Sequence, residues 1–252
     1  MLEIQALKGQ EKITMLTAYD YPTAMVLDQA GIDIILVGDS LGNVILGQPH
    51  TLGVTLEHMI HHTKAVSQGV KKSFVVADMP FGTYQASTEQ AVQNATDLIA
   101  KGGAHAVKLE GGKPILSTVE RLVSIGIPVM GHVGLTPQSV HQLGGYKTQG
   151  KSEKKAKQIF EDACALEKAG AFAIVLECIP EELAQKITDT LHIPTIGIGS
   201  GAKTDGQVLV FHDLVGFTPS HIPSFVHPVA HIFEDLTNHV KTFIARTKEM
   251  SS

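Results

Sequence analysis

Ionisable side chains stand at the carboxyl ends of five apolar runs in this sequence. Asp39 follows Ile-Ile-Leu-Val-Gly, Asp78 follows Phe-Val-Val-Ala, Glu110 ends Ala-Val-Lys-Leu-Glu, His132 ends Val-Met-Gly-His, and Glu177 ends Ala-Ile-Val-Leu-Glu. Such runs are typical of parallel strands that are buried on both faces. In a closed barrel of parallel strands the carboxyl ends meet at one mouth, where active sites lie. The sequence therefore predicts that these groups gather at a single site.

The spacing of Lys108 and Glu110 indicates where their side chains point. They are two residues apart, so on a strand they share one face, while Val107 and Leu109 share the other. In a barrel the apolar face packs on the helices, and Lys108 and Glu110 then point into the lumen. A buried charge without a partner costs several kcal/mol, so we expect each of them to have one.

The acids among these residues predict a metal site. Asp39, Asp78 and Glu110 would repel one another on meeting, and a divalent cation relieves that repulsion. A few carboxylates completed by water suit Mg²⁺ rather than Zn²⁺. The alternative is an ion-pair network in which Lys108 bridges the carboxylates and no metal binds. The gathering of three acids with Lys108, His132 and Glu177 favours a functional site.

Several further polar features each allow a functional and a structural interpretation. Gly197-Ile198-Gly199-Ser200-Gly201 could cradle a phosphate on backbone N–H groups or form a tight turn with positive φ. Ser40 could donate a hydrogen bond to a substrate oxygen or cap a local turn. We expect Asp20 to cap the following helix, and Cys178 to pack as a small buried group.

Three histidines, His58, His61 and His62, have helical spacing, but the acid of a His-Glu-x-x-His metal motif is missing. A surface or subunit-contact role is therefore favoured over a metal site.

Eight strand candidates alternate with amphipathic stretches along the whole chain. The strands are expected at residues 13–18, 34–38, 74–78, 106–110, 128–132, 173–177, 194–199 and 207–210. Helices are expected at residues 21–30, 56–68, 88–101, 113–124, 152–169, 181–191 and 227–247. Regular alternation means parallel strands, and eight of them favour a closed barrel. We predict a (β/α)8 TIM barrel, with one catalytic domain over residues 1–252 and functional loops at 41–55 and 134–151.

Composition excludes several classes of protein. The chain has 252 residues, of which 43% are hydrophobic, a net charge of −5 and two cysteines. It lacks the basic surplus of a nucleic-acid-binding protein, the apolar run of a membrane span and the core of a signal peptide. Cys164 and Cys178 fit no disulfide framework. We expect a cytoplasmic protein that binds neither nucleic acid nor membrane.

Ordered motifs from about residue 17 to about residue 223 resemble the ketopantoate hydroxymethyltransferase family. They are Thr17-Ala18-Tyr19-Asp20, Leu36-Val37-Gly38-Asp39-Ser40-Leu41-Gly42, Ala77-Asp78-Met79-Pro80-Phe81, Val107-Lys108-Leu109-Glu110-Gly111-Gly112, Gly131-His132-Val133-Gly134-Leu135-Thr136-Pro137-Gln138, Gly144-Gly145-Tyr146-Lys147, Leu176-Glu177-Cys178-Ile179-Pro180 and Ile196-Gly197-Ile198-Gly199-Ser200-Gly201. Two segments depart from the expected pattern, residues 48–53, which lack the aspartate often found there, and Ser224, where lysine is common. These departures lie away from the metal acids, Lys108 and Glu177.

The resemblance implies roles for particular residues. Asp39, Asp78 and Glu110 match the metal acids of the family, and Asp39, Ser40, Asp78 and Lys108 match its 2-oxo acid contacts. Glu177 matches its general base, and His132 is expected to orient the substrate or Glu177. The family implies Mg²⁺, 5,10-methylenetetrahydrofolate as co-substrate, pantothenate biosynthesis, and a homodecamer built as a pentamer of dimers. We therefore expect transfer of a hydroxymethyl group to 3-methyl-2-oxobutanoate, giving 2-dehydropantoate.

Two other functions remain open on the sequence. One is a magnesium-dependent lyase or mutase of the phosphoenolpyruvate mutase and isocitrate lyase type, which would also bind a 2-oxo acid. The other is a barrel that binds such an acid without catalysis. Cleavage of a carbon–carbon bond without folate would favour the first. Tight ligand binding without exchange of the C3 hydrogen would favour the second.

Overall fold

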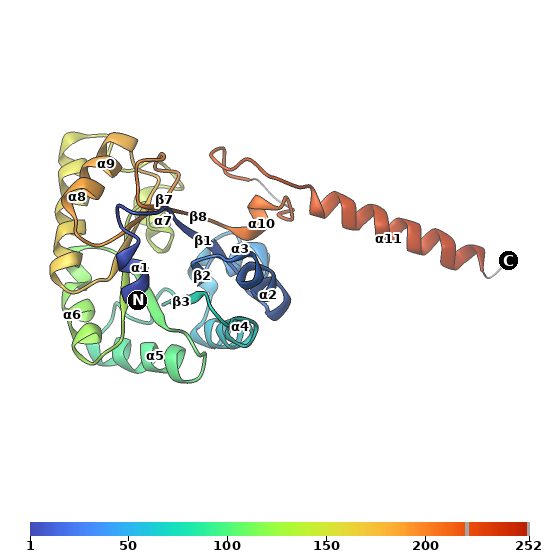
Figure 1. Ribbon diagram of the computed structural model, residues 1–252, viewed down its shortest axis with the longest axis horizontal. Coiled ribbons are helices and arrows are strands. Elements are labelled where there is room, and N and C mark those ends of the chain that lie inside the picture. The colour runs from blue at the N-terminus through green and yellow to red at the C-terminus, as the bar shows by residue number, and fades with distance from the viewer. Residues whose placement is uncertain (220–221, 251–252) are drawn as a thin grey trace. The chain divides into compact units, whose positions relative to one another are not determined.

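Eight parallel strands close into a barrel in the computed structural model, which describes residues 1–219 and 222–250. The strands pair in chain order from first to last, and the prediction of a (β/α)8 barrel is confirmed (Figure 1). Their bounds are β1 Ile13–Thr17, β2 Ile34–Val37, β3 Phe74–Asp78, β4 Ala106–Glu110, β5 Val129–Gly134, β6 Ala173–Glu177, β7 Thr195–Ile198 and β8 Gly206–Leu209. Each lies at a predicted position, with ends shifted by no more than two residues.

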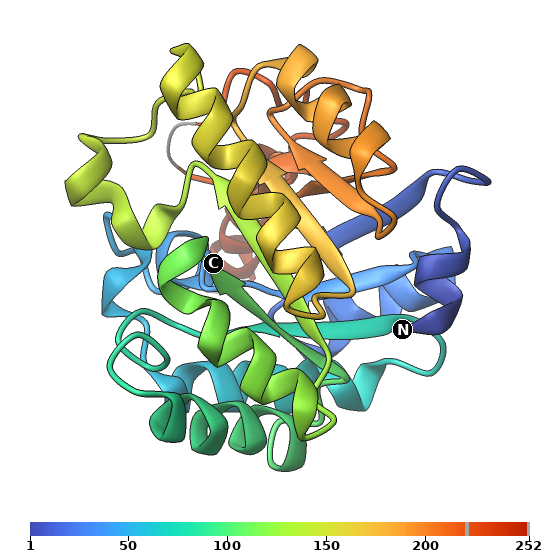
Figure 2. The same cartoon turned by 90° about the vertical axis from the view of Figure 1, so that its left-hand side faces the viewer.

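The helices that cover the barrel follow the predicted alternation. The long ones in the barrel are α2 Tyr21–Ala30, α4 Leu56–Gly69, α5 Thr88–Ala100, α6 Leu116–Ser124, α8 Glu153–Lys168 and α9 Glu181–Thr190. Short elements are α1 Leu2–Ala6, α3 Leu41–Val44, α7 Val140–Leu143 and the 3-10 turns η1 Thr51–Gly53, η2 Lys113–Ile115 and η3 Pro137–Ser139. Figure 2 shows these helices outside the strands, with α8, in yellow, crossing in front of them.

The chain divides into two compact units, Met1–Val208 and Leu209–Ser252. The second unit contains α10 Phe211–Leu214 and α11 Ile232–Glu249. The helix expected at residues 227–247 therefore starts later than predicted. Pro228 has no N–H for a helical hydrogen bond, and the N–H of Val229 donates instead to the carbonyl of Leu214 at 2.8 Å. In the described residues no helix is long and apolar enough to span a bilayer.

Local side chains fix where the barrel helices begin. Asp20, Thr55, Ser87 and Ser152 each accept a hydrogen bond from the backbone N–H three residues on, which satisfies an N–H that the first helical turn leaves free. The expectation that Asp20 caps its helix is confirmed. His58 completes a capping box, because its Nδ1 accepts from the Thr55 N–H at 3.2 Å.

The barrel core is built from side chains of one strand parity. Buried lumen residues include Ile34 and Leu36 on β2, Val76 on β3, Ala106 on β4, Met130 on β5 and Val175 on β6. Because alternate residues share a face, the same parity continues on β3 to Asp78, on β4 to Lys108 and Glu110, on β5 to His132, and on β6 to Glu177. The lumen is thus apolar along most of the strands and lined by ionisable side chains at their carboxyl ends.

Away from the site, Asp28 anchors the turn before β3. Its Oδ1 accepts from the N–H groups of Lys72 and Ser73, at 2.9 and 2.8 Å, and from Ser73 Oγ at 3.0 Å. Burial acts to raise the pKa of Asp28, but the backbone N–H donors outweigh it and hold that pKa below its usual value. The carboxylate is therefore bound more tightly in its charged form in the folded state than in the unfolded chain.

Asp28→Asn should destabilise the protein by about 1–3 kcal/mol at neutral pH, because an amide replaces the charged acceptor of these bonds. With a lowered folded pKa, the contribution of Asp28 is present above the unfolded value of about 3.9 and is lost as pH falls through the folded pKa. Urea unfolding at pH 7 and at pH 3.5 measures the difference. The same difference in free energy of unfolding between the two proteins at pH 3.5 as at pH 7 would contradict this account.

Candidate active site

The ionisable groups predicted from the strand ends come together with Lys108 in the upper lumen, and Glu177 is the one among them that is only partly buried. Asp39, Asp78, Lys108, Glu110 and His132 are all at least nine-tenths buried. They sit on four neighbouring strands or directly after them, and the register places Asp78 beside Lys108 and Glu110 beside His132. The expectation that Lys108 and Glu110 face the lumen is confirmed by these contacts and by strand parity.

A buried ion pair joins β3 and β4. Lys108 Nζ lies 2.8 Å from Asp78 Oδ1, and Asp78 Oδ2 accepts a hydrogen bond from the backbone N–H of Asp39 at 2.9 Å. Burial would lower the pKa of Lys108, but Asp78, Glu110 and Asp39 outweigh it and raise that pKa. Lys108 is therefore a fixed positive charge in the lumen.

His132 connects this ion pair to Glu177. Its Nδ1 lies 3.2 Å from Lys108 Nζ, and its Nε2 lies 3.2 Å from Glu177 Oε2. Burial and the neighbouring Lys108 lower the pKa of His132, so the ring is neutral. An ammonium can only donate, so Nδ1 accepts and the ring proton resides on Nε2, which faces Glu177. The tautomer follows from this hydrogen-bond partner.

The other two acids, when ionised, have charges that Lys108 does not balance. Burial, with repulsion from Asp78, raises the pKa of Asp39 to about 7, and burial with repulsion from Asp39 also raises the pKa of Glu110. Ionising all three carboxylates beside one ammonium would leave a buried surplus of negative charge, and carboxylate oxygens are the donors that Mg²⁺ prefers. In donor type and charge these residues fit a divalent cation. In this conformation, among residues 1–219 and 222–250, no three His, Cys, Asp or Glu side chains are grouped closely enough to hold a metal ion.

Two site residues escaped sequence reasoning, Gln138 and Tyr84. Gln138 Nε2 donates to Asp39 Oδ2 at 2.9 Å, and its backbone N–H donates to Glu110 Oε2 at 3.0 Å. Tyr84 hydroxyl lies 2.8 Å from Gln138 Oε1 and accepts from the Glu110 N–H at 3.1 Å. Gln138 lies in the 3-10 turn η3 and Tyr84 in the loop after β3, segments too short or irregular for strand or helix periodicity to give a signal.

Ser40 lies beside the acids but does not cap a helix. No side-chain cap bond is formed at the start of α3, and Ser40 Oγ lies 2.7 Å from the hydroxyl of Tyr19. The capping alternative is therefore not supported, and the hydroxyl is held by a buried tyrosine at the end of β1.

The glycine-rich segment after β7 forms a tight turn. Gly199 and Gly201 have φ of 60° and 76°, values that favour glycine. Ser200 Oγ donates to the carbonyl of Leu176 at 2.8 Å and so ties this turn to β6. The turn interpretation accounts for the glycines, and a phosphate site there stays a prediction.

Cys178, directly after Glu177, has a left-handed backbone with φ of 47°. Its N–H donates to the Ile198 carbonyl at 2.8 Å, and its carbonyl accepts from the Gln149 N–H at 2.8 Å. Burial, with Glu177 nearby, raises the pKa of the thiol to about 12, so the group stays neutral. The strained position fixes the strand end that carries Glu177.

Substitutions at Cys178 should follow backbone preference rather than thiol chemistry. Cys178→Val should destabilise the protein by about 1–3 kcal/mol, since a β-branched residue is strained at positive φ. Cys178→Gly should be close to neutral or stabilising. Thermal unfolding of both variants separates backbone strain from side-chain packing. An equal loss of stability in Cys178→Val and Cys178→Gly would indicate packing instead.

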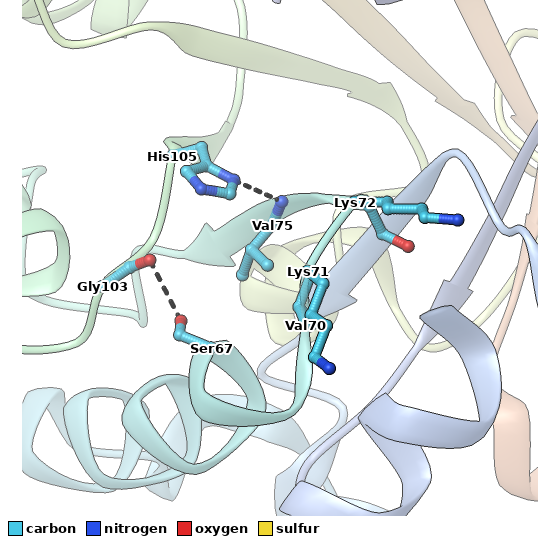
Figure 3. A pocket seen from close by; sticks show the side chains of 8 residues that line it. Ser67, Val70, Lys71, Lys72, Val75, Gly103 and His105 are labelled. Carbon is cyan, nitrogen blue, oxygen red and sulfur yellow. Dashed lines mark hydrogen bonds between the residues drawn. The ribbon is translucent and has the colours of Figure 1, made fainter. Parts of the chain in front are cut away.

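A surface hollow of about 280 Å³ lies far from this chemistry in the barrel. It is lined by Ser67, Val70, Lys71, Lys72, Ser73, Val75, Gly103 and His105, at the amino end of β3 (Figure 3). Ser67 Oγ donates to the Gly103 carbonyl, and His105 Nδ1 accepts from the Val75 N–H. The acids stand at the opposite, carboxyl ends of the strands.

Fold and site together define a TIM-barrel protein with a buried acid, lysine and histidine cluster at the carboxyl mouth. The sequence model of the ketopantoate hydroxymethyltransferase family matches residues 1–251. The chain belongs to this family, and the predicted membership and enzyme class are confirmed. A 3-methyl-2-oxobutanoate hydroxymethyltransferase of Thermoanaerobacter sp. (strain X514) is 58% identical over 96% of this chain and 89% of its own length. One from Syntrophotalea carbinolica is 51% identical over 99% and 94%.

Solved structures with the same fold are more distant in sequence. Phosphonopyruvate hydrolase in complex with oxalate and Mg²⁺ superposes with a TM-score of 0.66 at 12% identity, over 100% of this chain and 87% of that one. A 2,3-dimethylmalate lyase of the PEP mutase/isocitrate lyase superfamily gives 0.60 at 19% identity, over 83% and 77%. At these identities the likeness shows the barrel alone.

Proposed function

We propose that this chain transfers a hydroxymethyl group to 3-methyl-2-oxobutanoate, with 5,10-methylenetetrahydrofolate as the one-carbon donor and 2-dehydropantoate as the product. The observation that carries the proposal is the line of contacts from Asp78 through Lys108 and His132 to Glu177. It aligns a fixed cation, a neutral imidazole and a carboxylate in one lumen. The names of the relatives support the substrate, and the folate rests on family resemblance.

Asp39, Asp78 and Glu110 are the residues that would hold Mg²⁺. When bound, the cation would supply Lewis-acid polarisation to the carboxylate and ketone oxygens of a 2-oxo acid, which lowers the pKa of its C3 proton. The raised pKa values of Asp39 and Glu110, which reflect the cost of burying their charges without a balancing cation, support a divalent ion there. Ser40, which directly follows Asp39, would donate its hydroxyl to a substrate oxygen while it accepts from Tyr19.

The chain's own residues account for the proton transfer. The C3–H bond breaks, its proton passes to Glu177, and the electron pair spreads from C3 to the C2 oxygen. The Lys108 ammonium would stabilise the negative charge that develops there. His132 would hold Glu177 in place through Nε2, at the 3.2 Å contact described above. C3 then forms the new bond to the one-carbon unit, the two carbon–nitrogen bonds that hold this unit to the folate break, water supplies the hydroxyl group, and tetrahydrofolate leaves.

One assay tests the proposal. Purified protein is incubated with 3-methyl-2-oxobutanoate and 5,10-methylenetetrahydrofolate, with and without Mg²⁺, and 2-dehydropantoate is measured. Product that depends on all three components is expected. Cleavage of a carbon–carbon bond in a panel of 2-oxo and 2-hydroxy acids, without folate, would instead indicate lyase or mutase activity.

Asp78→Ala should weaken metal and 2-oxo acid binding together, because it removes a proposed ligand and leaves Lys108 without its 2.8 Å partner. Loss of one member of a buried ion pair costs about 3–5 kcal/mol, so part of the effect will appear as lower stability. Calorimetric titration of Mg²⁺, then of substrate, measures both affinities. Unchanged Mg²⁺ affinity in a folded variant would count against the site.

The family resemblance also supports an assembly and a compartment. We infer a homodecamer in the cytoplasm that serves pantothenate biosynthesis. Light scattering on the eluted protein distinguishes a ten-subunit mass from a monomer or dimer.

A further inference from the structure

A relay of amide groups leads from the loop after β3 to the proposed metal acids. Gln85 Oε1 accepts from the Gly82 N–H at 2.8 Å, which turns Gln85 Nε2 toward Gln138 Oε1 at 3.1 Å. Because a backbone N–H can only donate, the orientation of the Gln85 amide is fixed. It therefore presents a donor to Gln138.

Hydrogen-bond partners fix the orientation of the Gln138 amide in the same way. Its Oε1 faces the donors of Gln85 and Tyr84, while its Nε2 donates to the Met79 carbonyl at 3.0 Å and to Asp39 Oδ2 at 2.9 Å. A carbonyl oxygen only accepts, so a flipped amide would place two oxygens against each other at Met79. Gln138 is 6% exposed, and rotation would leave buried polar groups unpaired at a cost of about 1–3 kcal/mol.

Gln138 also binds the second acid, Glu110, through its main chain. Its backbone N–H donates to Glu110 Oε2 at 3.0 Å. One residue therefore binds one oxygen of Asp39 and one oxygen of Glu110. Each carboxylate keeps its other oxygen for another partner.

We propose that Gln138 is a positioning residue that restricts Asp39 and Glu110 to one metal-binding oxygen each, and so selects Mg²⁺ over Ca²⁺. The inference rests on the divalent site of the proposed function. Mg²⁺ requires near-octahedral coordination by single oxygens, whereas Ca²⁺ accepts six to eight ligands and readily takes a carboxylate by both oxygens. A hydrogen bond to one oxygen of Asp39 disfavours the two-oxygen mode.

The test compares cation affinities of the full-length protein, with Mg²⁺ and Ca²⁺ as the probes in separate calorimetric titrations. Gln138→Met keeps the length of the side chain and the backbone N–H to Glu110, but it frees Asp39 Oδ2. The ratio of the Mg²⁺ to the Ca²⁺ dissociation constant should rise about tenfold, the equivalent of one charge-assisted hydrogen bond. A merely structural role would weaken both cations alike and leave the ratio unchanged.

Gln158→Met is the matched control. It removes an exposed amide-to-carboxylate bond of the same kind, from Gln158 Nε2 to Asp162 Oδ2 at 3.0 Å, but leaves the bond from Gln138 to Asp39, so its ratio should stay close to that of the unmodified protein. Gln138→Asn, which retains an amide, covers the case in which Gln138→Met does not fold, and its shorter reach should give the same direction of change. Suppose that the unmodified protein binds Mg²⁺ and forms 2-dehydropantoate. An unchanged ratio of the Mg²⁺ to the Ca²⁺ dissociation constant in the folded Gln138 variants then overturns this inference alone. Absence of Mg²⁺ binding by the unmodified protein overturns both this inference and the metal site.

Discussion

Glu177→Gln should abolish exchange of the C3 hydrogen of 3-methyl-2-oxobutanoate while leaving the protein folded and able to bind metal. The carboxylate is the only change, and an amide of the same size cannot accept the proton. Loss of a general base costs about 10²–10⁴-fold in rate. Glu177 Oε2 lies 3.2 Å from His132 Nε2, which supports an oriented base rather than a mobile surface acid.

Proton NMR in deuterated water follows this exchange without folate or product formation, so the readout isolates the first step. Glu181→Gln is a suitable control, because Glu181 starts α9 just after the same strand and its Oε1 accepts from the Ala202 N–H at 3.0 Å. It should exchange at the unmodified rate. Near-normal exchange in Glu177→Gln, with unchanged Mg²⁺ affinity, would remove Glu177 from the role of base.

The barrel was predictable because its strands carry two independent signals. Apolar runs such as Ile34–Val37 mark strands buried on both faces, and the polar residue that ends or follows five of them marks the functional mouth. Alternation alone assigned Lys108 and Glu110 to the lumen. The short helices α3, α7 and α10 have four residues each, about one turn, so no amphipathic period could reveal them.

The hydrogen-bond partners inside the site were less predictable than its members. Gln138 stands 99 residues from Asp39 along the chain, and Tyr84 stands 54 residues from Gln138. Their contacts arise only when barrel closure brings separate loops over the lumen. The sequence also left two interpretations of the acids open, an ion-pair network and a metal site. The contacts show part of the ion-pair network, since Lys108 neutralises Asp78. Ionised Asp39 and Glu110 would have uncompensated charge, and the metal site stays a prediction.

That uncompensated charge should make Asp39 a cost to stability in the metal-free protein. Burial and Asp78 raise its pKa to about 7, against about 3.9 in an unfolded chain. Below pH 4 both states are protonated and Asp39 has no effect. As pH rises from about 4 to about 7 the unfolded chain ionises first, so stability is lost over that window and stays lower above it. Each unit of pKa difference is worth about 1.4 kcal/mol, so the full effect is a few kcal/mol.

Asp39→Asn should therefore stabilise the metal-free protein by about 1–4 kcal/mol at pH 8 and have no such effect at pH 3.5. The same substitution should lower the hydroxymethyl transfer rate by about 10²-fold or more, because a proposed metal ligand loses its charge. Urea unfolding at both pH values, with and without Mg²⁺, measures the first effect. Mg²⁺ should stabilise the unmodified protein by mass action and Asp39→Asn much less. With Mg²⁺ the unmodified protein should therefore be the more stable of the two. A variant that is less stable than the unmodified protein at pH 8 without metal would show that Asp39 is held by favourable contacts, and that the lumen does not store the charge a divalent cation would relieve.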